Sequence, residues 1–152
     1  MKKLYRFIRI VFSSVLFSLS TLAADPLVGR WETIDDSTGK PRSIVKIEQI
    51  NGEYQASVEK GFPRPGIPEK EFCDLCPGDK KGKPMIGLVF MWGLKGTAPD
   101  YSGGEVLDPD NGKVYKCKIT LADDQKSLTI RGFIGISLFG RSQTWNKVSQ
   151  EL

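Results

Sequence analysis

Histidine is absent from all 152 residues of the sequence. Its absence excludes Ser-His-Asp triads, Cys-His nucleophile pairs, histidine metal sites and the attachment motif of c-type haem. A long apolar run is also missing, since the longest, residues 10–19, is short of the roughly 20 residues that span a membrane and is interrupted by serines. No stretch keeps a 3.6-residue hydrophobic period over three turns. We therefore expect a mostly β protein with no cofactor and no metal.

The N-terminus has the layout of a secretory signal peptide. Four basic residues precede the apolar run, and Thr21 and Ala23 occupy the −3 and −1 positions of a cleavage site. An uncleaved membrane anchor is the alternative, which the short, serine-containing run disfavours. We predict a signal peptide over residues 1–23 and one soluble domain over 24–152. That domain is expected to be periplasmic or secreted, with no membrane span after cleavage.

The charge of the predicted mature domain is balanced. The whole chain has 22 basic and 18 acidic residues, and the signal segment contains four basic residues and no acidic ones. The mature domain therefore keeps 18 of each, and the isoelectric point near 9.0 belongs to the precursor. This balance gives no support to nucleic-acid binding. The local cluster Lys80, Lys81 and Lys83 is interpreted as a solvated part of a loop.

Eight short segments bounded by turn residues are predicted strands. Asn51-Gly52 is typical of a two-residue hairpin turn. A long loop over 60–84 precedes the fourth segment, which is apolar on both faces and is expected to be buried or beside a cavity. A glycine-rich loop over 93–104 follows it. The segments are 29–34, 42–49, 54–59, 85–92, 105–108, 113–121, 127–133 and 141–148.

Hairpin-length links between eight strands favour an all-β, antiparallel up-and-down barrel over a sandwich. Closure into a barrel removes the exposed edges that an open sheet would leave. The connection over 134–139 is expected to form one helical turn at most.

Gly29-Arg30-Trp31 resembles the Gly-x-Trp start of lipocalins and other calycins. In those barrels the tryptophan closes one end and packs against an arginine of the last strand. The resemblance implies that Trp31 closes this barrel with Arg141, or else with Arg131, as its partner. Trp145 is expected to be a further residue of the core or of a barrel end.

The sequence is also similar to the bacterial exported family called domain of unknown function 2147. Three stretches carry the resemblance, and they occur in the expected order along nearly the whole mature chain. The resemblance implies a lipocalin-like barrel and an exported location, and it transfers no catalytic residue. The stretches are 29–31, 103–109 with 111–115, and 131–133 continuing into 140–145.

The three cysteines leave several arrangements open. Cys73 and Cys76 in a Cys-x-x-Cys spacing fit a structural disulfide in an oxidising compartment. The alternatives are a redox-active pair, half a zinc ribbon, or two free thiols, but Pro77 and the lack of a second pair disfavour the first two. Cys117 can compete for a partner or pack as a buried thiol. We favour the Cys73–Cys76 disulfide with Cys117 buried.

Four aromatic residues are the candidate ligand-binding residues. Phe90, Trp92 and Tyr101 flank the glycine-rich loop near one barrel end, and Tyr115 lies on the apolar face of the sixth strand. Aromatic side chains around a concave mouth often hold apolar ligands. Core packing is the alternative interpretation of all four.

Paired acidic residues occur only in predicted turns, at 35–36, 108–110 and 123–124. There Asp bonds its own backbone, which disfavours a glycosidase pair or a calcium loop. The leading hypothesis is therefore a non-enzymatic, lipocalin-like protein that binds a small hydrophobic ligand in or at the mouth of the barrel. The alternative is a filled barrel that contacts an envelope partner through the 60–84 loop. An enzyme would have to work with Asp, Glu, Ser, Tyr or Lys alone.

Overall fold

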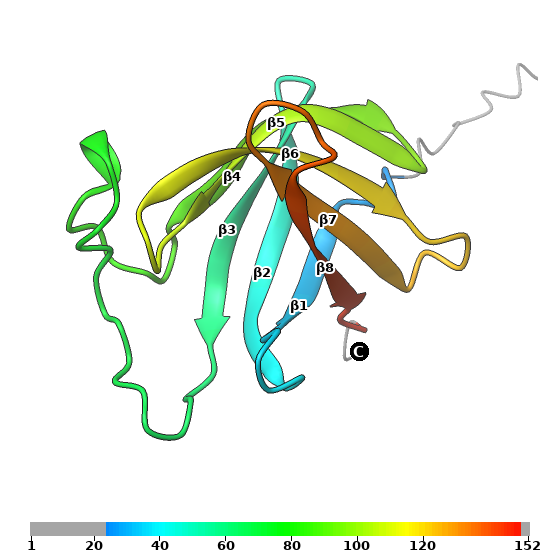
Figure 1. The fold of residues 1–152 in the computed structure, drawn as a ribbon. Coiled ribbons are helices and arrows are strands. Elements are labelled where there is room, and N and C mark those ends of the chain that lie inside the picture. Colours follow the sequence, from blue (N-terminus) through cyan, green and yellow to red (C-terminus); the bar gives the residue numbers. More distant parts are fainter. Residues whose placement is uncertain (1–23, 150–152) are drawn as a thin grey trace, which may run out of the picture.

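The computed structural model describes residues 24–149, so the predicted signal peptide lies outside the described residues. Eight antiparallel strands form a closed barrel in which each strand pairs with its neighbours in the chain and β1 pairs with β8 (Figure 1). This confirms the predicted up-and-down barrel. The strands are β1 (Gly29–Ile34), β2 (Pro41–Ile50), β3 (Glu53–Gly61), β4 (Val89–Thr97), β5 (Asp100–Asp108), β6 (Lys113–Leu121), β7 (Ser127–Phe133) and β8 (Gly140–Lys147).

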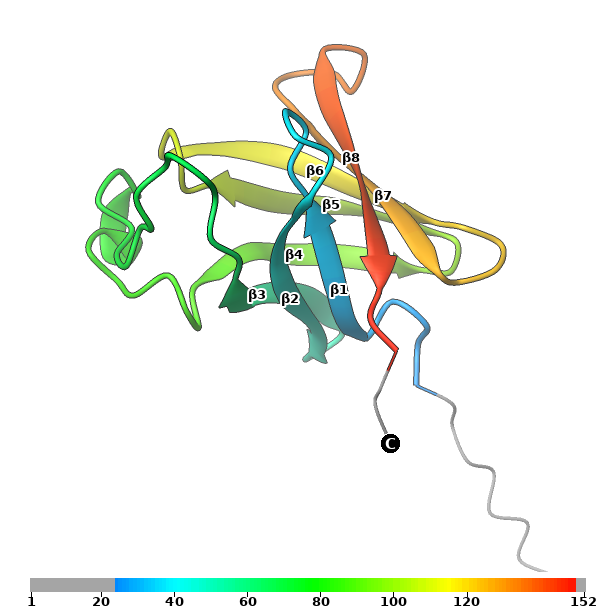
Figure 2. The same cartoon turned by 90° about the horizontal axis from the view of Figure 1, so that it is seen from below.

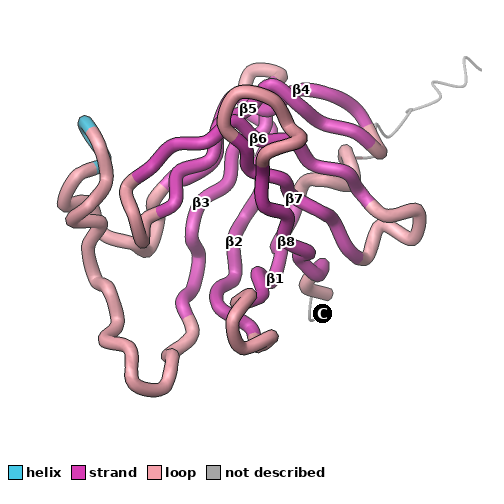
Figure 3. Tube along the Cα trace, viewed as in Figure 1, coloured by secondary structure: helices cyan, strands magenta, loops and turns pink. Residues whose placement is uncertain are grey.

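Helix is limited to one turn, η1 (Gly78–Lys80), within the part of the chain that the structure describes (Figure 3). The predicted hairpin at Asn51-Gly52 is confirmed, and both residues have the positive φ angles, 53° and 81°, that such a tight turn requires. The boundaries around β4 and β5 were predicted wrongly. Residues 93–97 and 100–104 extend these two strands into one hairpin, because glycine did not interrupt the ladder as expected.

The barrel has two different ends. At one end lie the short turns β2–β3, β4–β5 and β6–β7 together with residues 24–28, and we call this the closed end. At the other lie the loops β1–β2, β3–β4, β5–β6 and β7–β8, and we call this the open end. In Figure 2 the two described chain termini lie near each other, on the closed-end side.

The closed end is sealed by the segment that precedes β1. The Trp31 indole N–H donates a hydrogen bond to the Leu27 carbonyl at 2.9 Å, and the Leu27 N–H donates to Asp25 at 2.9 Å. The Tyr101 hydroxyl donates to the same Asp25 oxygen at 2.5 Å. Burial, followed by this bond to a carboxylate, raises the pKa of Tyr101 well above its ordinary value. The hydroxyl therefore stays protonated as a donor.

Lys147 completes this end of the barrel. Its ammonium lies 5.1 Å from the centre of the Trp31 ring and donates to the Pro26 carbonyl at 2.6 Å. The prediction that Arg141 or Arg131 partners Trp31 is therefore wrong. The reason is register, since Lys147 is the residue of β8 that pairs with Trp31, whereas Arg141 lies at the open-end start of that strand.

The long β3–β4 loop, residues 62–88, extends to the left of the barrel in Figure 1, and parts of it line the mouth at the open end. Cys73 and Cys76 form the predicted disulfide, and both are buried in the core cluster. A side chain at Gly112 would clash with the Leu75 carbonyl, so the loop approaches the β5–β6 turn closely where only glycine fits. Cys117 is a buried free thiol, and burial raises its pKa to about 12.

Candidate ligand-binding cavity

An open-ended cavity of about 1110 Å³ occupies the open-end part of the barrel interior and its mouth, where the long β3–β4 loop also lines it. Small-molecule sites usually measure about 300–1,000 Å³, so this space is sufficient for a ligand. Its wall is mostly apolar, and its rim is formed by charged residues of the open-end loops. The apolar wall includes Val45, Val58, Phe90, Val106, Ile130 and Trp145.

A β-bulge directs Phe90 into this cavity. Ala56 pairs with Met91 and Ser57 pairs with Val89, so Phe90 is an extra residue without a partner on β3. Phe90 and Met91 are consequently both buried in the core, although they are adjacent along the strand. The Phe90 ring lies 6.2 Å from the Trp145 ring, centre to centre. The two aromatic rings together form part of the cavity wall.

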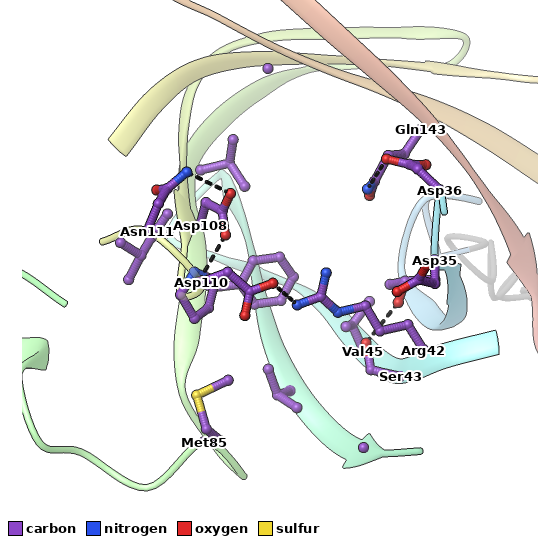
Figure 4. A pocket seen from close by; sticks show the side chains of 18 of the residues that line it. Asp35, Asp36, Arg42, Ser43, Val45, Met85, Asp108, Asp110, Asn111 and Gln143 are labelled. Atoms are coloured by element: carbon purple, nitrogen blue, oxygen red, sulfur yellow. Dashed lines mark hydrogen bonds and ion pairs between the residues drawn. The ribbon is translucent and has the colours of Figure 1, made fainter. Parts of the chain in front are cut away.

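An ion-pair network crosses the mouth. Arg42 at the start of β2 bonds to Asp110 in the β5–β6 turn, three strands away around the barrel, and Lys70 of the long loop reaches the same carboxylate at 3.2 Å. Figure 4 shows the Arg42 and Asp110 side chains extended toward each other. Burial acts to raise the pKa of Asp110, but the hydrogen bonds and charges of Arg42 and Lys70 outweigh it and lower the pKa.

The β1–β2 loop contributes two further carboxylates to the rim. Asp35 accepts hydrogen bonds from the Ser37 hydroxyl and from the backbone N–H groups of Ser37 and Thr38. The Ser37 hydroxyl is the main cause that lowers the pKa of Asp35 to about 2. Asp36 bonds to Arg141 and accepts from the Gln143 amide at 2.9 Å, which joins this loop to β8.

Comparison with known proteins supports the same architecture. Residues 29–147 match the model of the family described as "Uncharacterized protein conserved in bacteria", DUF2147. This chain is a member of DUF2147. A search of curated proteins finds no match for it.

A solved structure with a similar fold is HP1028 of the human pathogen Helicobacter pylori, which is described as a member of the lipocalin family. The TM-score is 0.69 with 22% sequence identity, over 82% of this chain and 84% of that one. The likeness shows that this DUF2147 chain has a lipocalin-like fold. Residues 24–149 contain no helix long and apolar enough to cross a membrane.

The DUF2147 barrel brings together some of the candidate ligand-binding residues. Phe90 and Tyr115 line the cavity, and so does Trp145, which was expected only as a core or barrel-end residue. Arg141 also lines it, through its place on the rim. Trp31 does not, because it lies at the closed end.

Trp92 and Tyr101 lie outside the cavity, which corrects their predicted place at the mouth. Trp92 is on the outer face of β4, where its indole N–H donates to Glu105 at 3.0 Å and the Lys80 ammonium lies 4.9 Å from its ring. The bulge at Phe90 explains the error, since simple alternation would put Phe90 and Trp92 on one face. Tyr101 is at the closed end, because β5 starts five residues earlier than predicted.

The rim residues were missed by sequence reasoning. Arg42, Lys70 and Asp110 are far apart in the chain, and Asp110 was interpreted as turn chemistry alone. The Asp110 carboxylate accepts its hydrogen bonds from Arg42 and Lys70. Within its own turn, the Asp110 backbone N–H donates to Asp108. The available signal was a charged residue at the first or second position of a strand, which is where Arg42 lies in β2. Groups of three or more possible metal ligands are absent from residues 24–149.

Proposed function

We propose that this DUF2147 protein is an exported binding protein that takes up a small, largely apolar molecule through the open end of its barrel. The observation that carries the proposal is the cavity of about 1110 Å³, with an apolar wall and a charged rim. Burial of an apolar ligand there contributes roughly 25 cal/mol per Å² of apolar surface removed from water. The proposed mechanism is equilibrium capture with no covalent step.

The cavity supports binding more than the filled-barrel alternative, in which side chains would occupy the interior. In the cavity lining the Ser37 hydroxyl donates to Asp35, but the pKa of that carboxylate is lowered to about 2, which makes it a weak base and favours a binding protein over an enzyme. The long loop remains a candidate contact surface for an envelope partner, since its Leu75 side chain is 58% exposed, but its disulfide is already buried in the core cluster.

The test is the binding of an environment-sensitive apolar dye to wild-type protein and to Val58→Phe. Val58 lines the cavity, so a phenylalanine there should fill part of it and weaken dye binding at least about tenfold. Val114→Phe is the matched control, because Val114 is exposed on β6 and outside the lining. Equal dye binding by all three proteins would refute the proposed site.

A further inference from the structure

The loop between β7 and β8, residues 134–139, exposes four large hydrophobic side chains within six residues. Its side chains are exposed by 65% at Ile134, 61% at Ile136, 75% at Leu138 and 71% at Phe139. We call these four residues the apolar tip. Figure 2 shows the loop projecting beyond the neighbouring strands. A contiguous exposed apolar surface of this kind marks an interaction site.

Three backbone carbonyls of the β7–β8 loop are already hydrogen-bonded within the protein. Arg131 donates its Nε to the Ser137 carbonyl at 2.6 Å and its Nη2 to the Leu138 carbonyl at 3.0 Å. The Phe139 N–H donates to the Ile136 carbonyl at 3.2 Å. Unpaired backbone groups are costly in an apolar medium. These bonds therefore lower the cost of moving the tip out of water.

The tip offers almost no directional contacts to a partner. Residues 132–140 contain no charged side chain, and Ser137 carries the only side-chain polar group among them. A protein partner normally supplies a polar rim that needs matching donors and acceptors. Acyl chains need none, so the chemistry of the tip favours a lipid phase.

Charge at the base of the loop favours a phospholipid surface in particular. Arg131 and Arg141 flank the tip. Arg141 is paired with Asp36, whereas Arg131 forms no ion pair with any carboxylate of residues 24–149. Its guanidinium already donates one N–H each to Ser137, Ser142 and Leu138, which leaves two of its five N–H groups for a phosphate. Basic side chains placed beside an apolar insertion segment are the usual arrangement of interfacial anchors.

We propose that this protein docks on the surface of a phospholipid bilayer through the apolar tip. Ile136 and Leu138 enter the acyl region, and Arg131 lies at the level of the phosphates. Ile134 and Phe139 line the cavity mouth as well, so docking brings the mouth to the bilayer. Docking itself does not depend on the ligand proposed above.

The experiment measures the fraction of protein that sediments with vesicles of phosphatidylethanolamine and phosphatidylglycerol. It uses the processed protein recovered from cells, with its first residue read from its mass. The double variant Ile136→Asp, Leu138→Asp should partition at least about tenfold more weakly than wild type, equivalent to about 1.4 kcal/mol. Ile50→Asp is the matched control, because Ile50 is 48% exposed at the closed end.

A second readout does not depend on loss of binding. The tryptophan fluorescence of Leu138→Trp should be quenched by vesicles with brominated acyl chains. The fluorescence of Ile50→Trp should be quenched no more than that of the wild-type protein. Neither Ile136 nor Leu138 lines the cavity, so the double variant should bind the apolar dye as wild type does. Failure of docking is thereby distinguished from failure of the binding proposal.

Three results would overturn docking. The first is that wild-type protein stays in the supernatant when vesicles are present. The second is that the double variant and Ile50→Asp lose vesicle binding equally. The third is that wild-type protein forms a dimer without vesicles and the double variant does not. That result would assign the apolar tip to contact with a second copy of the chain.

Discussion

The two ends of the barrel are organised by different forces. At the closed end the large side chains Trp31, Tyr54 and Tyr101 are fully buried, and the Tyr54 and Tyr101 rings meet edge to face at 5.1 Å. At the open end the loops are joined by ion pairs such as Arg42–Asp110 around a cavity. The comparison indicates that stability is concentrated at the closed end, which leaves the open end available for a ligand.

Truncation of one tryptophan at each end should show the largest difference. Trp31→Ala should lower the free energy of unfolding by about 3–5 kcal/mol, because it empties a packed space. Trp145→Ala should cost less, since part of that ring already faces the cavity. Urea unfolding measures both losses. Equal losses would contradict the asymmetry.

Removal of one tyrosine hydroxyl at each end sharpens the comparison. Tyr101→Phe should cost about 1–3 kcal/mol of unfolding free energy, because Asp25 loses a short hydrogen bond. Tyr115→Phe should change it by less than about 0.5 kcal/mol, because the contact of its hydroxyl with Asn111 at 3.2 Å is exposed. Thermal and urea unfolding of the two variants check this. A larger loss from Tyr115→Phe would reverse the ranking.

The sequence predicted the features that depend on local chemistry. Asn51-Gly52 needs positive φ at both residues, and strict alternation of Tyr115, Cys117 and Ile119 marks a strand with one apolar face. The Cys73–Cys76 disulfide likewise follows from a three-residue spacing. Each of these signals lies within a few residues.

Features that depend on pairing between strands were not predictable. The bulge that turns Phe90 inward is visible only when β4 is paired with β3. Lys147 takes the place expected for Arg141 because the register of β8 against β1 puts it opposite Trp31. The meeting of Arg42 with Asp110 depends on closure of the whole barrel.

The ion pair across the mouth should matter more to ligand entry than to stability. Arg42 and Asp110 are 32% and 35% exposed, so a double-mutant cycle with Arg42→Gln and Asp110→Asn should give a coupling below about 1 kcal/mol. The same substitutions should raise the association rate of an apolar dye, because the ion pair no longer crosses the mouth. Stopped-flow mixing measures this rate. A large stability coupling with an unchanged rate would contradict the comparison.

The smallest effect concerns pH at the open end. The pKa of Asp35 falls from 3.8 to about 2 on folding, so its contribution to stability is present above pH 3.8 and is lost as pH falls through about 2. Asp35→Asn should therefore reduce the fall in unfolding free energy at acid pH and leave its pH dependence above pH 5 parallel to that of wild type. Urea titrations at a series of pH values measure this. An unchanged acid limb would exclude Asp35 as a source of acid sensitivity.

The central claim is that the open cavity holds a small molecule. Native mass spectrometry of the protein, purified gently and without reducing agent from the cells that express it, tests this most directly. The account predicts a species heavier than the polypeptide by a discrete mass that denaturation releases. It also predicts that the Val58→Phe variant carries no such additional mass. A bare polypeptide mass for wild type, unchanged after exposure to apolar cell extracts, would contradict it.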